Sequence, residues 1–170
     1  PCAGEYAWQT VNLTKPTAKA AIHQKRRKFK RPFAKAVDIA KTVKHYGGHR
    51  MLELPTDSGY WKYERVLKLI KDFGLEIALF DGCAFELKGY KKRIKKQWKV
   101  LTDCPALHVD LHGKLRNGQH CHEQCEGKLT IKSSKYPYNL ALSIHKAHRT
   151  GCKSGAEHAQ LQLKKSLRNR

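Results

Sequence analysis

Apolar side chains recur along residues 17–46 at intervals that suit one face of an α-helix. The positions on this face are Ile22, Phe29, Phe33, Val37, Ala40 and Val43. Their separations are roughly multiples of 3.6 residues, which predicts a long amphipathic helix. Pro32 interrupts the pattern, so we expect either a kinked helix or two helices of which the second begins at Pro32. The pair Gly47-Gly48 is expected to end the helical segment.

Shorter apolar runs predict strands on both sides of a second helix. Residues 49–54 fit a strand, and residues 63–73 fit a helix that stops at Gly74. The apolar run within residues 76–87 is typical of a buried strand. Residues 97–102 follow a basic turn, residues 88–96, and are expected to form the hairpin partner of that strand.

A last helix is expected to begin near Pro137 and to bury Leu140, Ile144 and Ala147, after an irregular segment rich in Cys and His. Helices that alternate with strands predict an α/β fold with a small, mostly parallel sheet. The hairpin would close this sheet with an antiparallel strand, and the helices would pack on it. We expect one domain over residues 1–150, which includes the Cys/His segment at about 104–125, and a basic tail over 151–170.

The net charge of the chain indicates the kind of partner that it binds. Lys and Arg number 35 against 14 Asp and Glu, a formal net charge of +21. So basic a domain repels itself unless a polyanion neutralises it, and nucleic acid is the usual polyanion. We therefore expect RNA or DNA as the partner and no membrane, since no apolar run reaches the roughly 18 residues of a span. Nucleus, cytosol and organelle all remain compatible with the sequence.

Three clusters of basic residues are candidates for contact with nucleic acid. The candidates are Lys25, Arg26, Arg27, Lys28, Lys30 and Arg31; Lys91, Lys92, Arg93, Lys95 and Lys96; and Lys164, Lys165 and Arg168. In the first cluster, Phe29 would supply the buried contact of the helix. The second cluster is flanked by Tyr90 and Trp98. Basic residues interleaved with aromatic ones suit a surface that follows a backbone and stacks unpaired bases. The alternative is that Trp98 lies in the core and the lysines only keep the surface soluble.

The segment QHCHEQC, residues 119–125, raises the question of a metal site. The candidate ligands are Cys104, His108, His120, Cys121, His122 and Cys125. Two short pairs separated by a loop are typical of a structural zinc module, and Cys104 with His108 would supply the first pair. Cys121 with Cys125, or either of His120 and His122 with Cys125, would supply the second. Structural zinc is the favoured reading, against histidines that contact phosphate and against catalytic zinc.

The order of several short motifs resembles a group of retroelement-type reading frames from protists and other eukaryotes. The motifs include Pro1-Cys2 with Trp8-Gln9, the strand 52–55 followed by Trp61, and FDGCAFEL followed by WKVLTDC. In that group a patch of the form Cys-x-Gly-x-His-x-His-x-x-Cys and a Tyr-Pro helix come next. Here Gly118, His120, His122 and Cys125 correspond to the patch, and Tyr136-Pro137 to the helix start.

The element order also resembles the C-terminal half of a Rossmann-like methyltransferase, in particular a DNA cytosine-5 enzyme. That resemblance implies that Cys2 attacks a flipped cytosine, that Glu53 holds the ring nitrogen and that Arg93 supports the base or its phosphate. A terminal thiol and a salt-bridged strand end are the simpler readings of Cys2 and Glu53. The family's glycine-rich cofactor loop has no counterpart in the sequence, which contains no G-x-G.

These observations favour a binding protein over an enzyme. We expect a zinc-stabilised nucleic-acid-binding module, for example a structural component of a ribonucleoprotein or a retroelement-type complex. One alternative is a fragment of a nucleic-acid methyltransferase that uses Cys2 as nucleophile. Another is a basic adaptor for acidic protein partners.

Overall fold

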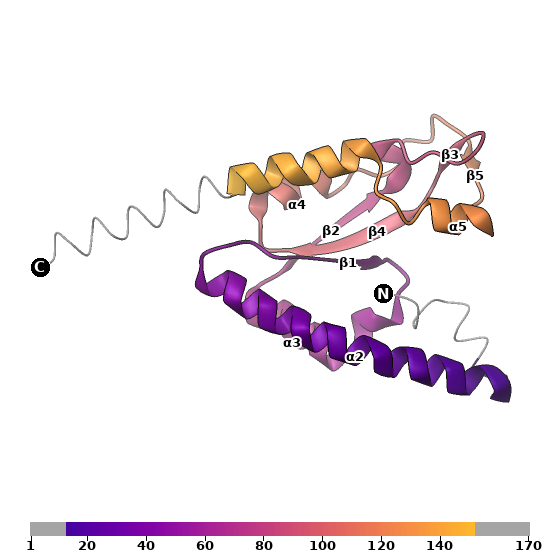
Figure 1. Ribbon diagram of the computed structural model, residues 1–170. Helices are drawn as coiled ribbons and strands as arrows, with labels where there is room; N and C mark the ends of the chain where they lie inside the picture. Colours follow the sequence, from indigo (N-terminus) through magenta and orange to yellow (C-terminus); the bar gives the residue numbers. More distant parts are fainter. Residues whose placement is uncertain (1–12, 152–170) are drawn as a thin grey trace, which may run out of the picture.

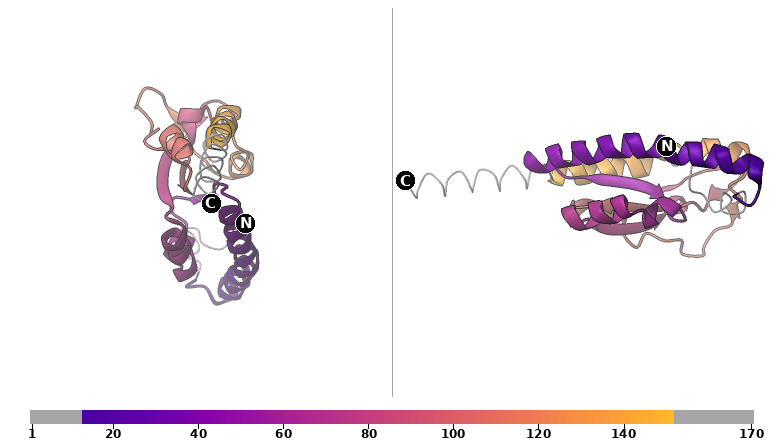
Figure 2. Two further views of the ribbon diagram at one scale, coloured as in Figure 1. Left: turned by 90° about the vertical axis from the view of Figure 1, so that its left-hand side faces the viewer. Right: turned by 90° about the horizontal axis from the view of Figure 1, so that it is seen from below.

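Helices cover both faces of a three-stranded sheet in the computed structural model, which describes residues 13–151 (Figure 1). The helices on one face are α2 (Pro16–His45) and α3 (Glu64–Phe73), and those on the other are α4 (Pro105–Leu111) and a helix over 138–151. An end-on view separates the two helix pairs across the sheet (Figure 2). None of the described helices is both long and apolar enough to cross a membrane.

The sheet is antiparallel, so the prediction of a mostly parallel sheet is wrong. Its strands are β1 (Met51–Pro55), β2 (Glu76–Asp81) and β4 (Gln97–Thr102), in the order β1-β4-β2. Both outer strands run antiparallel to β4, and Met51 and Glu76 both lie opposite Thr102. The strands β1 and β2, which α3 connects, do point in the same direction, as the strand-helix-strand pattern of the sequence indicates. However, β4 lies between them and removes every parallel pairing from this sheet.

The composition of β4 explains its central position. Trp98 and Val100 are 2% exposed and belong to the core on the α4 side, whereas Leu101 is fully buried in the core on the α2 and α3 side. A strand that is apolar on both faces is stable only between two layers. The predicted hairpin pairing of β2 with 97–102 is confirmed by the register from Glu76–Thr102 to Asp81–Gln97.

The first helix, α2, is continuous through Pro32. Pro32 lies on the exposed side, where the carbonyl group that loses its partner is open to water. The predicted apolar face is confirmed at Ile22, Phe29 and Phe33, which are all buried. Phe29 stacks on Tyr60 with ring centroids 3.6 Å apart. This contact docks α2 on the short helix η1 (Gly59–Lys62), which precedes α3.

A second, smaller sheet lies at one end of the molecule, at the right of Figure 1. Its strands are β3 (Arg93–Ile94) and β5 (His122–Glu123), which run parallel, and the short helices nearby are η2 (Gly82–Phe85) and α5 (Lys128–Lys132). The Cys/His segment is therefore more regular than the sequence predicts, because α4 and β5 both lie in it. Gly74 adopts the expected left-handed conformation after α3, with φ 60°.

Candidate metal centre and adjoining basic surface

Cys83, His120 and His122 form a group whose ligand atoms all lie within 4.8 Å of one another. Cys83 lies in η2, directly after β2, and His122 lies in β5. It is the one such group of three in the part of the chain that the structure describes. The group thus joins the end of the main sheet to the small second sheet.

The turn that carries Cys83 is fixed by close packing around Gly82. A Cβ atom at Gly82 would lie 2.8 Å from both Leu87 and Trp98, so only glycine fits between these side chains. The Gly82 N–H donates to the carbonyl oxygen of Lys96 at 2.7 Å. Together these contacts set the direction of the Cys83 side chain relative to β4.

The two histidines are positioned from the other side by the pairing of β5. His122 lies opposite Arg93 in the parallel pair of β3 and β5. The adjacent Glu123 accepts three backbone N–H bonds through Oε2, from Tyr90 and Lys91 at 2.9 Å and from Lys92 at 3.2 Å. These bonds tie β5 to the basic turn and so fix the backbone at His122.

Burial favours the neutral forms of both the thiol and the imidazole in this group; a neutral imidazole can ligate a metal, whereas the thiol must first lose its proton. Burial, and to a lesser extent the nearby carboxylate of Asp81, raises the pKa of the Cys83 thiol. Burial, together with the charges of His120 and Arg116, lowers the pKa of His122, which favours the neutral imidazole that ligates metals. The Nε2 atoms of His120 and His122 are both buried, and neither has a hydrogen-bond partner among residues 13–151. A metal ion would satisfy both, so this group could hold one.

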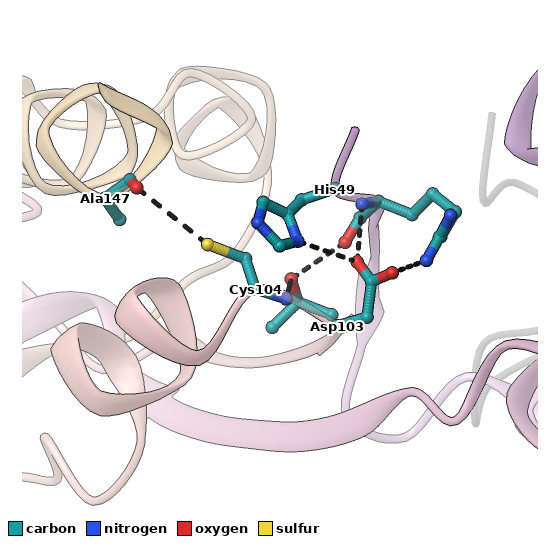
Figure 3. A network of polar contacts seen from close by, with 6 residues as sticks. His49, Asp103, Cys104 and Ala147 are labelled. Carbon is teal, nitrogen blue, oxygen red and sulfur yellow. Dashed lines mark hydrogen bonds and ion pairs between the residues drawn. The ribbon is translucent and has the colours of Figure 1, made fainter. Parts of the chain in front are cut away.

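The structure brings His120 and His122 together, but it places the other predicted ligands elsewhere. Cys104 is buried beneath the helix 138–151, with its Sγ atom 3.8 Å from the Ala147 carbonyl oxygen (Figure 3). His108 Nε2 lies 3.1 Å from the Ile77 carbonyl oxygen on the α4 side. Cys125 Sγ lies 3.2 Å from Ser133 Oγ, and Cys121 is exposed.

The residues directly before Cys104 make hydrogen bonds and ion pairs that hold the fold together. Asp103 pairs with Arg50 and with His49 Nδ1, the latter at 3.7 Å, and it accepts the Arg50 backbone N–H at 2.7 Å (Figure 3). Thr102 Oγ1 donates to the Arg50 carbonyl at 2.8 Å. These bonds fasten the segment before β1 to the end of β4 and leave Cys104 in the core.

Cys83 lies outside the dense Cys/His segment 104–125, so the ligand spacing within that segment does not point to it. It reaches the histidines through the β3–β5 pairing, which the sequence does not predict. One local signal was present. The motif Asp81-Gly82-Cys83 stands where the chain leaves β2, and side chains at such a strand end commonly converge on a site.

Glu53 and Arg93, two of the residues implied by the methyltransferase resemblance, contact different residues. Glu53, on β1, accepts a hydrogen bond from Tyr136 Oη at 2.9 Å, and burial raises the pKa of its carboxyl group. Arg93 donates to the Cys83 carbonyl at 3.2 Å and lies 3.6 Å from Glu86. Cys2 falls outside the described residues, as do the basic tail residues Lys164, Lys165 and Arg168.

Two open hollows with basic walls adjoin the metal group. The turn hollow is lined by Lys88, Gly89, Tyr90, Lys91, Lys92, Arg93, His120 and Cys121. The loop hollow is lined by Ala84, Arg93, Leu115, Arg116, Asn117, Gln119 and His120. Arg93 and His120 form part of both, so His120 faces the surface while it belongs to the metal group.

Of the other predicted contact residues, Lys95 is exposed, whereas Lys96 donates to the Ser133 carbonyl at 2.9 Å. On α2, five of the six basic candidates are exposed and Arg26 is half-buried. The α2 cluster and the basic turn lie on different layers of the fold (Figure 1).

Comparison of the chain with protein-family models, with curated proteins and with solved structures found no match. The resemblances to retroelement reading frames and to methyltransferases are neither supported nor contradicted by this result.

Proposed function

We propose that this protein is a nucleic-acid-binding module. A structural zinc ion at Cys83, His120 and His122 would order the basic surface that the turn hollow and the loop hollow form. The observation that carries the proposal is the position of His120, which is part of the metal group and of both basic hollows. An ion held there would fix the walls of the surface that meets the partner.

Zinc is the metal that suits these donors. One thiolate and two imidazoles are borderline-soft ligands, which zinc prefers over the oxygen sets that magnesium and calcium require. Because burial raises the pKa of the Cys83 thiol, zinc must displace its proton on binding. Zinc binding should therefore release a proton and weaken as the pH falls.

The hollows suit the backbone of a single strand. Lys91, Lys92 and Arg93 can approach successive phosphates from the turn hollow, and Arg116 can do so from the loop hollow. Tyr90 is 64% exposed, and Lys132 Nζ lies 4.7 Å from its ring centroid. An exposed aromatic ring among cations is the usual platform on which an unpaired base stacks.

A fluorescence titration tests the two parts of the proposal. Labelled single-stranded RNA and double-stranded DNA would be titrated with the full chain, with zinc or with a chelator, at two salt concentrations. Cys83→Ser should bind as weakly as the chelated protein. Val109→Ser, at a position on α4 that is 75% exposed and outside the metal group and both hollows, should bind like the wild type.

Two results would overturn the proposal. Tight binding that survives both chelation and Cys83→Ser would remove the metal from the function. No binding of either nucleic acid at low salt would remove nucleic acid as the partner, whatever the metal does.

A further inference from the structure

The carboxylate of Asp81 lies buried beside the metal group and has one oxygen without a partner. Asp81 is 1% exposed at the end of β2. Its Oδ2 atom accepts the backbone N–H of Arg116 at 3.0 Å. Its Oδ1 atom has no hydrogen-bond partner among residues 13–151. A buried carboxylate oxygen left in this state is costly, so a ligand for Oδ1 would remove a substantial penalty.

Asp81 is close to two of the three metal-binding candidates. It precedes Cys83 by one glycine, and its charge influences the pKa of both Cys83 and His122. Oδ1 is not within 4.8 Å of all three other ligand atoms, so coordination requires these side chains to approach one another. Rotamer changes of His120 and His122 can bring their ring nitrogens toward Oδ1 while Oδ2 keeps its bond to the Arg116 N–H.

We propose that Asp81 is the fourth protein ligand, which closes an Asp-Cys-His-His centre. The inference rests on the zinc site proposed above and extends it. A divalent ion with one thiolate, one carboxylate and two neutral imidazoles has no net charge, which suits a buried position. With three protein ligands the centre would keep a positive charge and an open position, as catalytic zinc sites do. Asp81 therefore makes this centre structural.

The fourth ligand also connects the ion to the basic surface. Oδ2 of Asp81 holds the backbone of Arg116, and the Asp81 N–H donates to the Lys114 carbonyl at 3.0 Å. The segment 114–120 supplies most of the loop hollow. Once Asp81 is bound to the ion, this segment is tied to the centre at His120 and at Arg116.

Cobalt in place of zinc gives a direct test on the full chain. Cys83 should produce a sulfur-to-cobalt charge-transfer band, and four-coordinate cobalt should absorb strongly in the visible range. Asp81→Asn should weaken Co²⁺ binding by more than about 100-fold, the upper end of the loss expected for a residue that only supports a ligand. It should keep the charge-transfer band but change the visible bands. Asp57→Asn, at an exposed position, is the control and should change neither.

The wild-type protein provides a second measurement that does not depend on the folding of any variant. Azide added to the cobalt-loaded chain should leave its spectrum unchanged, because a closed centre has no position for an added anion. A shift with azide, or an Asp81→Asn variant that folds and binds Co²⁺ like the wild type, would overturn the role of Asp81. The metal site itself would fail if the wild type did not bind Co²⁺, or if Cys83→Ser bound it unchanged.

Discussion

At the scale of single residues, Glu123 connects the basic turn to the metal group. Its Oε2 atom accepts the N–H groups of Tyr90, Lys91 and Lys92, a concave arrangement of backbone donors that favours an anion. Gly89 leaves no room for a Cβ atom because the Glu123 carboxylate lies against it. The turn and His122 are therefore positioned by the same carboxylate.

We expect Glu123→Gln to lower the melting temperature at pH 7 and to weaken zinc binding. The backbone N–H of Lys91 first, and those of Lys92 and Tyr90 with it, lower the pKa of Glu123 below its ordinary 4.5. The stability that its charged form contributes is present above that value and is lost as the pH falls through the lowered pKa. Melting curves of the chelated proteins should therefore converge in acid. A gap that is equal at pH 7 and pH 3 would contradict this account, and the exposed Glu126→Gln is the control.

Glu53 should show the opposite dependence on pH. Burial raises its pKa, against the hydrogen bond from Tyr136 and the charge of Lys96. The charged form is thus disfavoured in the fold, and stability falls as the pH rises through the raised pKa. Glu53→Gln, which can still accept from Tyr136, should melt above the wild type at pH 7 and equal to it below about pH 4. Tyr136→Phe should melt lower at pH 7, and a destabilised Glu53→Gln would show that pairing outweighs burial.

Two of the three residues of the metal group could be predicted from the sequence, and one could not. His120 and His122 lie in a dense Cys/His segment, which is itself a signal. Cys83 lies far upstream in an apolar context, where its thiol looks like an ordinary core residue. Conversely, Cys104 and Cys125 fit the zinc spacing but pack into the core cluster, since a free cysteine also serves as a small apolar side chain.

At the scale of elements, α2 depends on a few aromatic contacts. Phe29 is 8% exposed and stacks on Tyr60 and Phe33, with ring centroids 3.6 and 5.3 Å away. The basic residues on both sides of Phe29 keep their positions only while this ring is docked. The hydrophobic contact thus holds a charged surface in place.

We expect Phe29→Ala to lower the free energy of unfolding by about 3–5 kcal/mol, the usual loss for a buried aromatic side chain. Ile39→Ala, on the same helix but at a position 63% exposed, should change it by less than about 0.5 kcal/mol. Urea denaturation followed by circular dichroism measures both. Equal small losses would mean that α2 is not docked through Phe29.

The elements themselves were more predictable than their arrangement. The periodicity of α2 and α3, the β2–β4 hairpin and the helix after Pro137 follow from local patterns that the structure confirms. The position of β4 between β1 and β2 does not follow from any local pattern. A hairpin strand can pair on either free edge of its partner, and the choice depends on burial of Trp98 and Leu101 on opposite faces.

At the scale of the whole molecule, the net charge of +21 attracts any polyanion, but it does not locate the contact. The dependence of affinity on salt counts the phosphates that protein cations neutralise, so a change of that count in a variant shows whether the altered residues make the contact. For a single strand, each neutralised phosphate contributes about 0.7 to the slope of log affinity against log salt. Two variants with equal charge but different positions can therefore separate a local interface from a general attraction.

The variant Lys91→Gln, Lys92→Gln, Lys95→Gln removes three exposed charges from the basic turn. If the turn contacts single-stranded RNA, the salt slope should fall by about 2, which is three phosphates at about 0.7 each. The matched control is Lys41→Gln, Lys62→Gln, Lys71→Gln, which also removes three exposed charges but from α2, η1 and α3 outside the basic clusters. The control should leave the slope within the error of the titration. Equal changes in both variants would show that the protein attracts nucleic acid through its overall charge and not through the surface around Arg93 and His120.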